Sequence, residues 1–167
     1  MAKHVYFFGG GKAEGASGMR DVLGGKGAEL AEMTNLGIPV PPGFTITTHA
    51  WVEYTRAGRR LPDALWPDVL ANLRRLEAAT GLGFGADQRP LLVSVRSGAR
   101  VSMPGMMETV LNLGLNDRTT QALGAATNNE RFAWDCYRRF IAMFADVVLG
   151  IDRRHFDHRT VLEQNRH

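Results

Sequence analysis

The chain has 167 residues, room for one domain or a large part of one, and its 44% hydrophobic and 22% charged residues are ordinary for a soluble globular protein. No apolar run approaches the roughly 20 residues that a membrane helix needs, and glycine interrupts the amino-terminal residues too early for a secretory signal. Twenty basic and 17 acidic residues give a net charge of +3, without a Lys/Arg-rich block of the kind that binds nucleic acid. Composition thus predicts a cytoplasmic protein with neither a membrane nor a nucleic-acid partner.

The amino-terminal half alternates short apolar runs with helical patterns. Leu30, Met33 and Leu36 recur at helical spacing, and Gly37 follows them as a good residue to end a helix. The predicted elements are a strand at 5–8, a glycine-rich loop at 9–19, a helix at 26–36, a strand at 44–47, a helix capped by Thr48 that runs to Ala57, and a helix capped by Asp63 that runs to Thr80.

The second half begins with strands and continues with helices. Residues 91–95 predict a buried central strand and residues 109–113 another strand, whereas from Asn116 on the pattern is helical. The clearest helix is expected over 130–149, with Asn129 as its cap. Its predicted apolar stripe consists of Phe132, Cys136, Phe140, Met143, Phe144 and Val147, with Cys136, the single cysteine, expected as a buried small hydrophobe. Residues from 151 on predict the start of a further helix.

Two segments carry residue types that suit phosphate. In residues 24–27, Gly-Gly-Lys-Gly, Lys26 lies at a predicted helix start, where its ammonium and the helical N–H groups can approach phosphate oxygens. The glycine spacing is not that of a P-loop, and a solvated lysine in an amino-terminal turn is the alternative. Arg96 ends a predicted strand and opens a glycine-containing loop, where a guanidinium can pair with phosphate oxygens; a salt-bridged arginine at a strand end is the alternative.

These segments resemble the pyruvate, phosphate dikinase family, in its N-terminal nucleotide-binding domain of the ATP-grasp type. The resemblance rests on residues 23–33 followed by 37–48, on residues 93–109 and on residues 131–141, which occur in the family's order, and it runs over essentially the whole chain. It implies an α+β fold and a partial ATP-grasp-type domain. We expect a first lobe with a mixed sheet over residues 1–115 and a truncated helical subdomain over residues 116–167.

The resemblance also assigns nucleotide contacts to four residues. Lys26 matches a lysine that contacts the phosphates of ATP, and Arg96 matches an arginine that holds the transferred phosphates and stabilises charge as they leave. Gly105 and Met107 belong to a loop that lies against the nucleotide. We therefore expect Arg96 to be catalytic and all four residues to bind ATP.

Other polar residues are assigned no role in the chemistry. His49 stands in a short match to the family's phosphohistidine core, but the glycine-rich run that precedes the true site is missing, so we expect a surface residue. Glu108, Asp117 and Asp135 are not assigned as metal ligands, because the resemblance places the Mg²⁺ carboxylates in a lobe outside this chain.

The complete enzyme implied by the resemblance converts ATP, phosphate and pyruvate reversibly to AMP, pyrophosphate and phosphoenolpyruvate through a phosphohistidine on a mobile domain. Mg²⁺, a monovalent cation and a homodimer are implied with it. The chain would supply Lys26 and Arg96 to the ATP half-reaction. The sequence ends without a glycine, proline or polar tail, so we expect a truncated chain that is inactive alone.

Two alternatives stay open. Phosphoenolpyruvate synthase uses water in place of phosphate, but its later loop typically reads Arg-Ser-Ser-Ala-Thr, whereas residues 96–100 of this chain read Arg-Ser-Gly-Ala-Arg. That difference favours the dikinase. The other alternative is a non-catalytic remnant or binding module.

Overall fold

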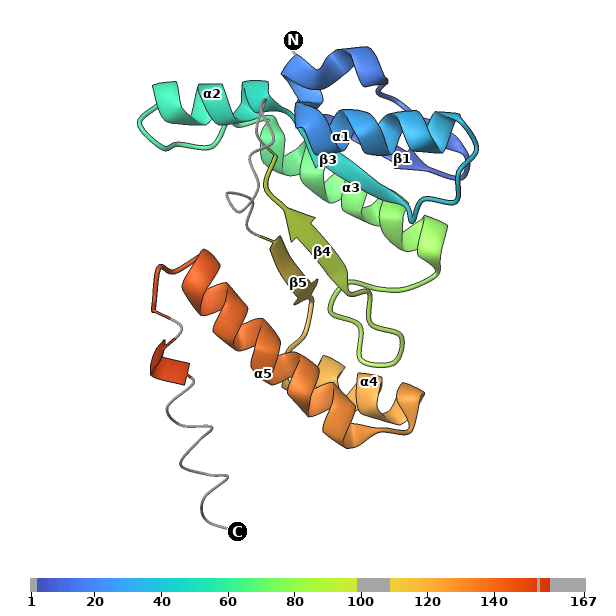
Figure 1. The fold of residues 1–167 in the computed structure, drawn as a ribbon, viewed down its shortest axis with the longest axis vertical. Coiled ribbons are helices and arrows are strands. Elements are labelled where there is room, and N and C mark those ends of the chain that lie inside the picture. The colour runs from blue at the N-terminus through green and yellow to red at the C-terminus, as the bar shows by residue number, and fades with distance from the viewer. Residues whose placement is uncertain (1–2, 99–108, 153, 157–167) are drawn as a thin grey trace. The chain divides into compact units, whose positions relative to one another are not determined.

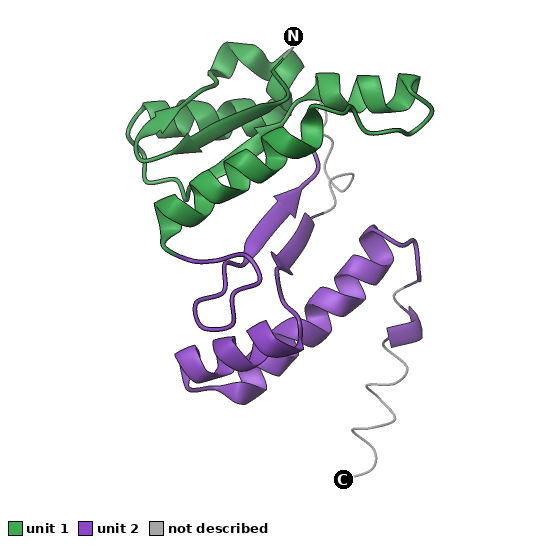
Figure 2. Ribbon diagram, turned by 180° about the vertical axis from the view of Figure 1, so that it is seen from behind, with its two compact units in different colours: residues 1–81, 98–107 green, residues 82–97, 108–167 purple. Residues whose placement is uncertain are grey.

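The computed structural model describes residues 3–98, 109–152 and 154–156, and the chain forms two compact units (Figure 2). Unit 1 comprises residues 1–81 with 98–107, and unit 2 comprises residues 82–97 with 108–167. Within each unit, helices pack beside short antiparallel strands (Figure 1). The predicted α+β class is therefore confirmed, whereas the division at residue 115 stays a prediction.

Unit 1 is built around a three-stranded sheet. Its strands are β1 (Val5–Gly9), β2 (Lys12–Ala13) and β3 (Gly43–Ile46), in the order β2-β1-β3, and both pairings are antiparallel. Gly9, Gly10 and Gly11 all have positive φ, a backbone conformation that glycine adopts without a Cβ clash, and they turn β1 back into β2.

Helices cover both faces of this sheet: α1 (Arg20–Asn35) one face and α3 (Leu65–Thr80) the other, while α2 (Thr48–Arg56) follows β3. Val5 packs in a cluster with Ala50 of α2 and Leu65 of α3. The next residue, Tyr6, packs against the Leu23, Ala28 and Ala31 cluster of α1. Successive side chains of a strand point to opposite faces, so α1 and α3 lie on opposite sides of β1 (Figure 1).

The described part of unit 2 includes a two-stranded ribbon and two helices of more than ten residues. The strands β4 (Val93–Arg96) and β5 (Thr109–Leu113) are antiparallel, and α5 (Glu130–Val147) contacts both β5 and α4 (Asp117–Thr127). Asn116 and Thr119 form a reciprocal capping box at the start of α4. Asn129 caps α5 by accepting the Phe132 N–H at 2.9 Å, as predicted.

In unit 1, several predicted boundaries are wrong. The stretch expected as a loop over 9–19 contains β2 and a 3₁₀ turn at Ser17–Met19, and the helix expected from residue 26 begins at Arg20. Thr47, not Thr48, caps α2, because the Ala50 N–H bonds to the Thr47 hydroxyl. Asp63 caps nothing; it pairs with Arg60 at 3.6 Å, and α3 begins without a side-chain cap.

In unit 2, the predicted burial is the main error. The strand expected to be buried over 91–95 starts at Val93, and Val95 is 48% exposed. On α5, which ends at Val147, Phe132 is 48% exposed and Cys136 is half-buried. The buried residues of α5 are instead small: Ala133, Ala142 and Ala145.

Candidate functional site

Lys26 lies just after a break in helix α1. Gly24 has φ 69° and ψ 171°, which is not helical, so α1 consists of a short first segment and a second segment that starts anew after this residue. That backbone region is accessible essentially to glycine alone. The first N–H groups of a new helical segment have no carbonyl one turn earlier to bond, and they form the positive end of the helix dipole. The break therefore places Lys26 near the start of the second segment of α1.

The second segment of α1 sits very close to strand β3. A Cβ built on Gly27 would lie 2.8 Å from Thr45 Cγ2 and 3.0 Å from Thr45 Oγ1, both shorter than ordinary contacts. Gly25 and Gly27 are buried, whereas Lys26 between them is half-buried. The glycines thus bring the backbone against the sheet, and the lysine stem is partly covered there.

Arg96 is the last residue of β4 and faces Thr109 across the β4–β5 ribbon. Its side chain is exposed. Lys26 belongs to unit 1 and Arg96 to unit 2, and each is placed within its own unit. Gly105 and Met107 lie outside the described residues.

Asp117 and Asp135, two carboxylates that were not assigned as metal ligands, have structural partners. Asp135 pairs with Arg139 at 2.7 Å and Arg138 at 3.0 Å, and the hydrogen bond from Arg138 is the main reason why its pKa is lowered. Burial raises the pKa of the Tyr137 phenol, and the charge and hydrogen bond of Asp117 add to this. Glu108 lies outside the described residues. Among the residues that are described, no three His, Cys, Asp or Glu side chains gather as a metal site.

His49 is exposed in the first turn of α2, the surface position expected for it.

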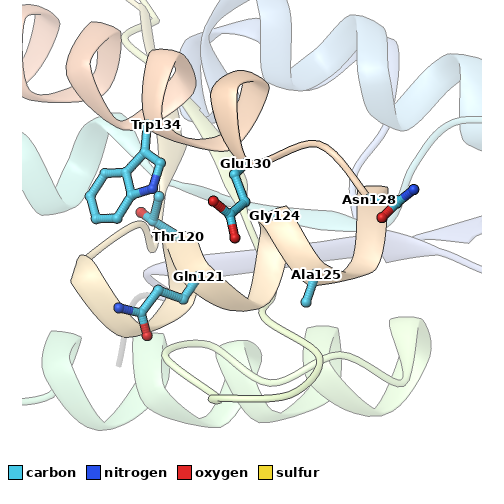
Figure 3. Close-up of a pocket in the computed structure, with 7 residues that line it drawn as sticks. All are labelled: Thr120, Gln121, Gly124, Ala125, Asn128, Glu130 and Trp134. Carbon is cyan, nitrogen blue, oxygen red and sulfur yellow. The ribbon is translucent and has the colours of Figure 1, made fainter.

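A shallow pocket of about 700 Å³ lies between α4 and the start of α5 (Figure 3). Its lining residues are Thr120, Gln121, Gly124, Ala125, Asn128, Glu130 and Trp134. Thr120 is fully buried, and its hydroxyl has no hydrogen-bond partner within the described structure. None of the four predicted nucleotide contacts lines this pocket, and its charged group, the Glu130 carboxylate, would repel phosphate.

The part that sequence reasoning missed is the break at Gly24. The Gly24–Gly25 pair was the available signal, since consecutive glycines interrupt helical patterns. Across the described residues, no helix is both long and apolar enough to cross a membrane.

Comparison with known proteins identifies a matching family and similar relatives. Residues 20–65, which include Lys26, match the family described as pyruvate phosphate dikinase, AMP/ATP-binding domain. The chain is 59% identical over 157 residues to a pyruvate, phosphate dikinase of Rhizobium meliloti, 53% identical over 158 residues to pyruvate, phosphate dikinase 2 of Zea mays, and 51% identical over 157 residues to that of Clostridium symbiosum.

These alignments cover 94% to 95% of the chain but only 18% of each relative. The chain thus spans less than a fifth of the length of the relatives it matches. The chain belongs to the pyruvate, phosphate dikinase family, as a segment that carries AMP/ATP-binding sequence.

Proposed function

We propose that this chain supplies phosphate contacts for the ATP half-reaction of a pyruvate, phosphate dikinase, from an ATP-grasp-type nucleotide-binding domain. The observation that carries the proposal is the position of Lys26 immediately after the Gly24 break, at the start of a helical segment. An ammonium and a set of free backbone N–H groups at one helix start suit the oxygens of a polyphosphate.

In the complete enzyme, a histidine outside this chain takes the β-phosphoryl group of ATP and passes it to pyruvate, so that ATP, phosphate and pyruvate yield AMP, pyrophosphate and phosphoenolpyruvate. Lys26 neutralises phosphate charge in the bound nucleotide. Arg96 holds the transferred phosphates and stabilises the charge that develops on the leaving oxygens. Gly105 and Met107 contact the nucleotide, and the complete enzyme is a homodimer.

We propose Mg²⁺ and a monovalent cation as cofactors of the complete enzyme, and we assign none of their ligands to this chain. When bound, Mg²⁺ would neutralise phosphate charge. The described residues contain no group of three ligands that fits it. The role proposed for this chain concerns its lysine and arginine.

The rival reading is a phosphoenolpyruvate synthase, which uses water where the dikinase uses phosphate. The names of the three relatives above favour the dikinase. Phosphate-dependent formation of AMP by the complete protein is the expected result, and turnover without phosphate would support the synthase.

The site assignment can be tested in a chimeric protein, in which this chain replaces the matching segment of the Rhizobium meliloti relative, 59% identical over 157 residues. We expect Lys26→Ala or Arg96→Ala to slow label exchange between ATP and AMP by roughly 30- to 1,000-fold, because one charged phosphate contact contributes about 2–4 kcal/mol to the transition state. Exchange between pyruvate and phosphoenolpyruvate should be nearly spared.

Lys12→Ala is the matched control, because Lys12 is an exposed lysine on β2 of the same unit. Equal loss of both exchange reactions would indicate misfolding, and normal exchange in the Lys26 and Arg96 variants would refute the assignment.

A further inference from the structure

A hydrogen bond from helix α2 reaches the first segment of α1, just before the break at Gly24. In an unbroken helix the Asp21 carbonyl would accept the Gly25 N–H, four residues later. The φ and ψ of Gly24, 69° and 171°, turn the peptide that carries this N–H out of its helical orientation. The Thr48 hydroxyl donates a hydrogen bond to the Asp21 carbonyl at 2.5 Å.

Thr48 is free to do this because its own helix does not use its hydroxyl as a cap. The cap of α2 is Thr47, which is 2% exposed and accepts the Ala50 N–H. Two adjacent threonines therefore have different tasks: Thr47 starts α2, and Thr48 reaches across to α1.

The same stretch of chain also touches α1 beyond the break. Thr45 of β3 lies against Gly27, where a Cβ would be only 2.8 Å from its methyl group. Thr48 thus holds α1 before Gly24 and Thr45 supports it after Gly24. Lys26 lies between these two contacts, on the segment whose direction they set.

We infer that Thr48 is a positioning residue for Lys26: its hydrogen bond to the Asp21 carbonyl stabilises the Gly24 break and so fixes where the Lys26 ammonium points. Its importance for nucleotide binding rests on the proposed function, but its effect on the break does not. The two parts can therefore fail separately.

The first test is amide hydrogen exchange in the 167-residue chain carrying Thr48→Val, which keeps the shape and removes the hydroxyl. The amides of Ala28, Glu29 and Leu30, whose helical acceptors are the carbonyls of residues 24–26, should exchange about tenfold faster. Amides in α3 should be unchanged, and Thr48→Ser should restore the original rates.

Thr55→Val is the matched control, because the Thr55 hydroxyl also bonds a backbone carbonyl, that of Trp51, but within α2 and on the surface. Faster exchange at residues 28–30 in Thr48→Val alone supports the inference. Unchanged exchange there, or an equal change in Thr55→Val or in α3, overturns it.

The second test measures ATP affinity in Thr48→Val, Lys26→Ala and the double variant. If Thr48 acts through Lys26, its substitution should weaken ATP binding in the wild-type background several-fold and have no effect once Lys26 is alanine. If the losses in ATP binding free energy of the two single variants add up in the double variant, Thr48 does not act through Lys26 and the positioning role is overturned. If Lys26→Ala leaves ATP affinity unchanged, the proposed function fails, and the exchange result still decides whether Thr48 holds the break.

Discussion

The Glu14 carboxylate connects separate parts of unit 1. It accepts the Phe7 N–H at 2.9 Å, pairs with Lys3 at 2.9 Å, and pairs with Arg75 of α3 at 2.8 Å. The Arg75 guanidinium also lies 4.2 Å from the centre of the Phe7 ring. The Glu14 side chain thus connects the turn after β2 to β1 and to α3.

This arrangement predicts a loss of stability in acid. Burial is the largest single influence and raises the pKa of Glu14, but the hydrogen bonds from Phe7, Lys3 and Arg75 together outweigh it and lower the pKa from 4.5 to about 2. The folded-state pKa is depressed, so the stabilisation is complete above pH 4.5 and is lost as the pH falls toward 2.

Urea unfolding of the wild type and Glu14→Gln should therefore show a difference in the free energy of unfolding that is constant near neutral pH and shrinks between these two pH values. Glu29→Gln is the control, since its pair with Arg20 is 3.3 Å long and exposed on both sides. A Glu14→Gln difference that does not depend on pH would contradict the assignment.

At the scale of elements, the decisive contact is that of α1 with β3. Gly27→Ala should destabilise unit 1 by about 1–3 kcal/mol, because the new methyl group overlaps with Thr45 and must push the helix from the strand. Thr45→Ala in the same chain removes the overlapping atoms and should recover part of this loss. Denaturant unfolding of the single and double variants measures the coupling. If the changes in the free energy of unfolding of the two single variants simply add up in the double variant, this contact does not set the distance between helix and strand.

The elements that the sequence predicted well are those determined locally. Asn129 caps α5 as predicted, because a cap requires only a short polar side chain and the next turn of its own helix. Thr48 was wrong as a cap because the neighbouring Thr47 serves α2, and Thr48 bonds to a residue far away in sequence. The burial of β4 was wrong for a related reason: an apolar strand is buried only when other elements cover it, and periodicity does not specify them.

For the whole molecule, the candidate site was predictable to the extent that it depends on short motifs. The Gly-Gly-Lys-Gly run gave the position of Lys26, and the strand end gave that of Arg96. The Gly24 break required the backbone itself, because two adjacent glycines do not reveal which of them leaves the helical region. The family resemblance seen in these motifs is confirmed by the matches over 94% of the chain.

The share of the relatives that the chain spans, 18%, leads to a prediction about activity. The carrier histidine and the pyruvate site of the proposed reaction lie outside these residues, so the purified 167-residue chain should not form AMP from ATP, phosphate and pyruvate. Chromatographic assay of AMP with and without pyruvate would check this. Pyruvate-dependent AMP above the background of a mock preparation would contradict it.

The central claim, that Lys26 contacts the phosphates of ATP, is tested most directly by calorimetric titration of the chain and of Lys26→Ala with ATP and with adenosine. Because a hydrogen bond to a charged group contributes about 1.5–3 kcal/mol, the account predicts that Lys26→Ala binds ATP at least about tenfold more weakly, with adenosine affinity unchanged. Equal ATP affinity of the two proteins would contradict the claim.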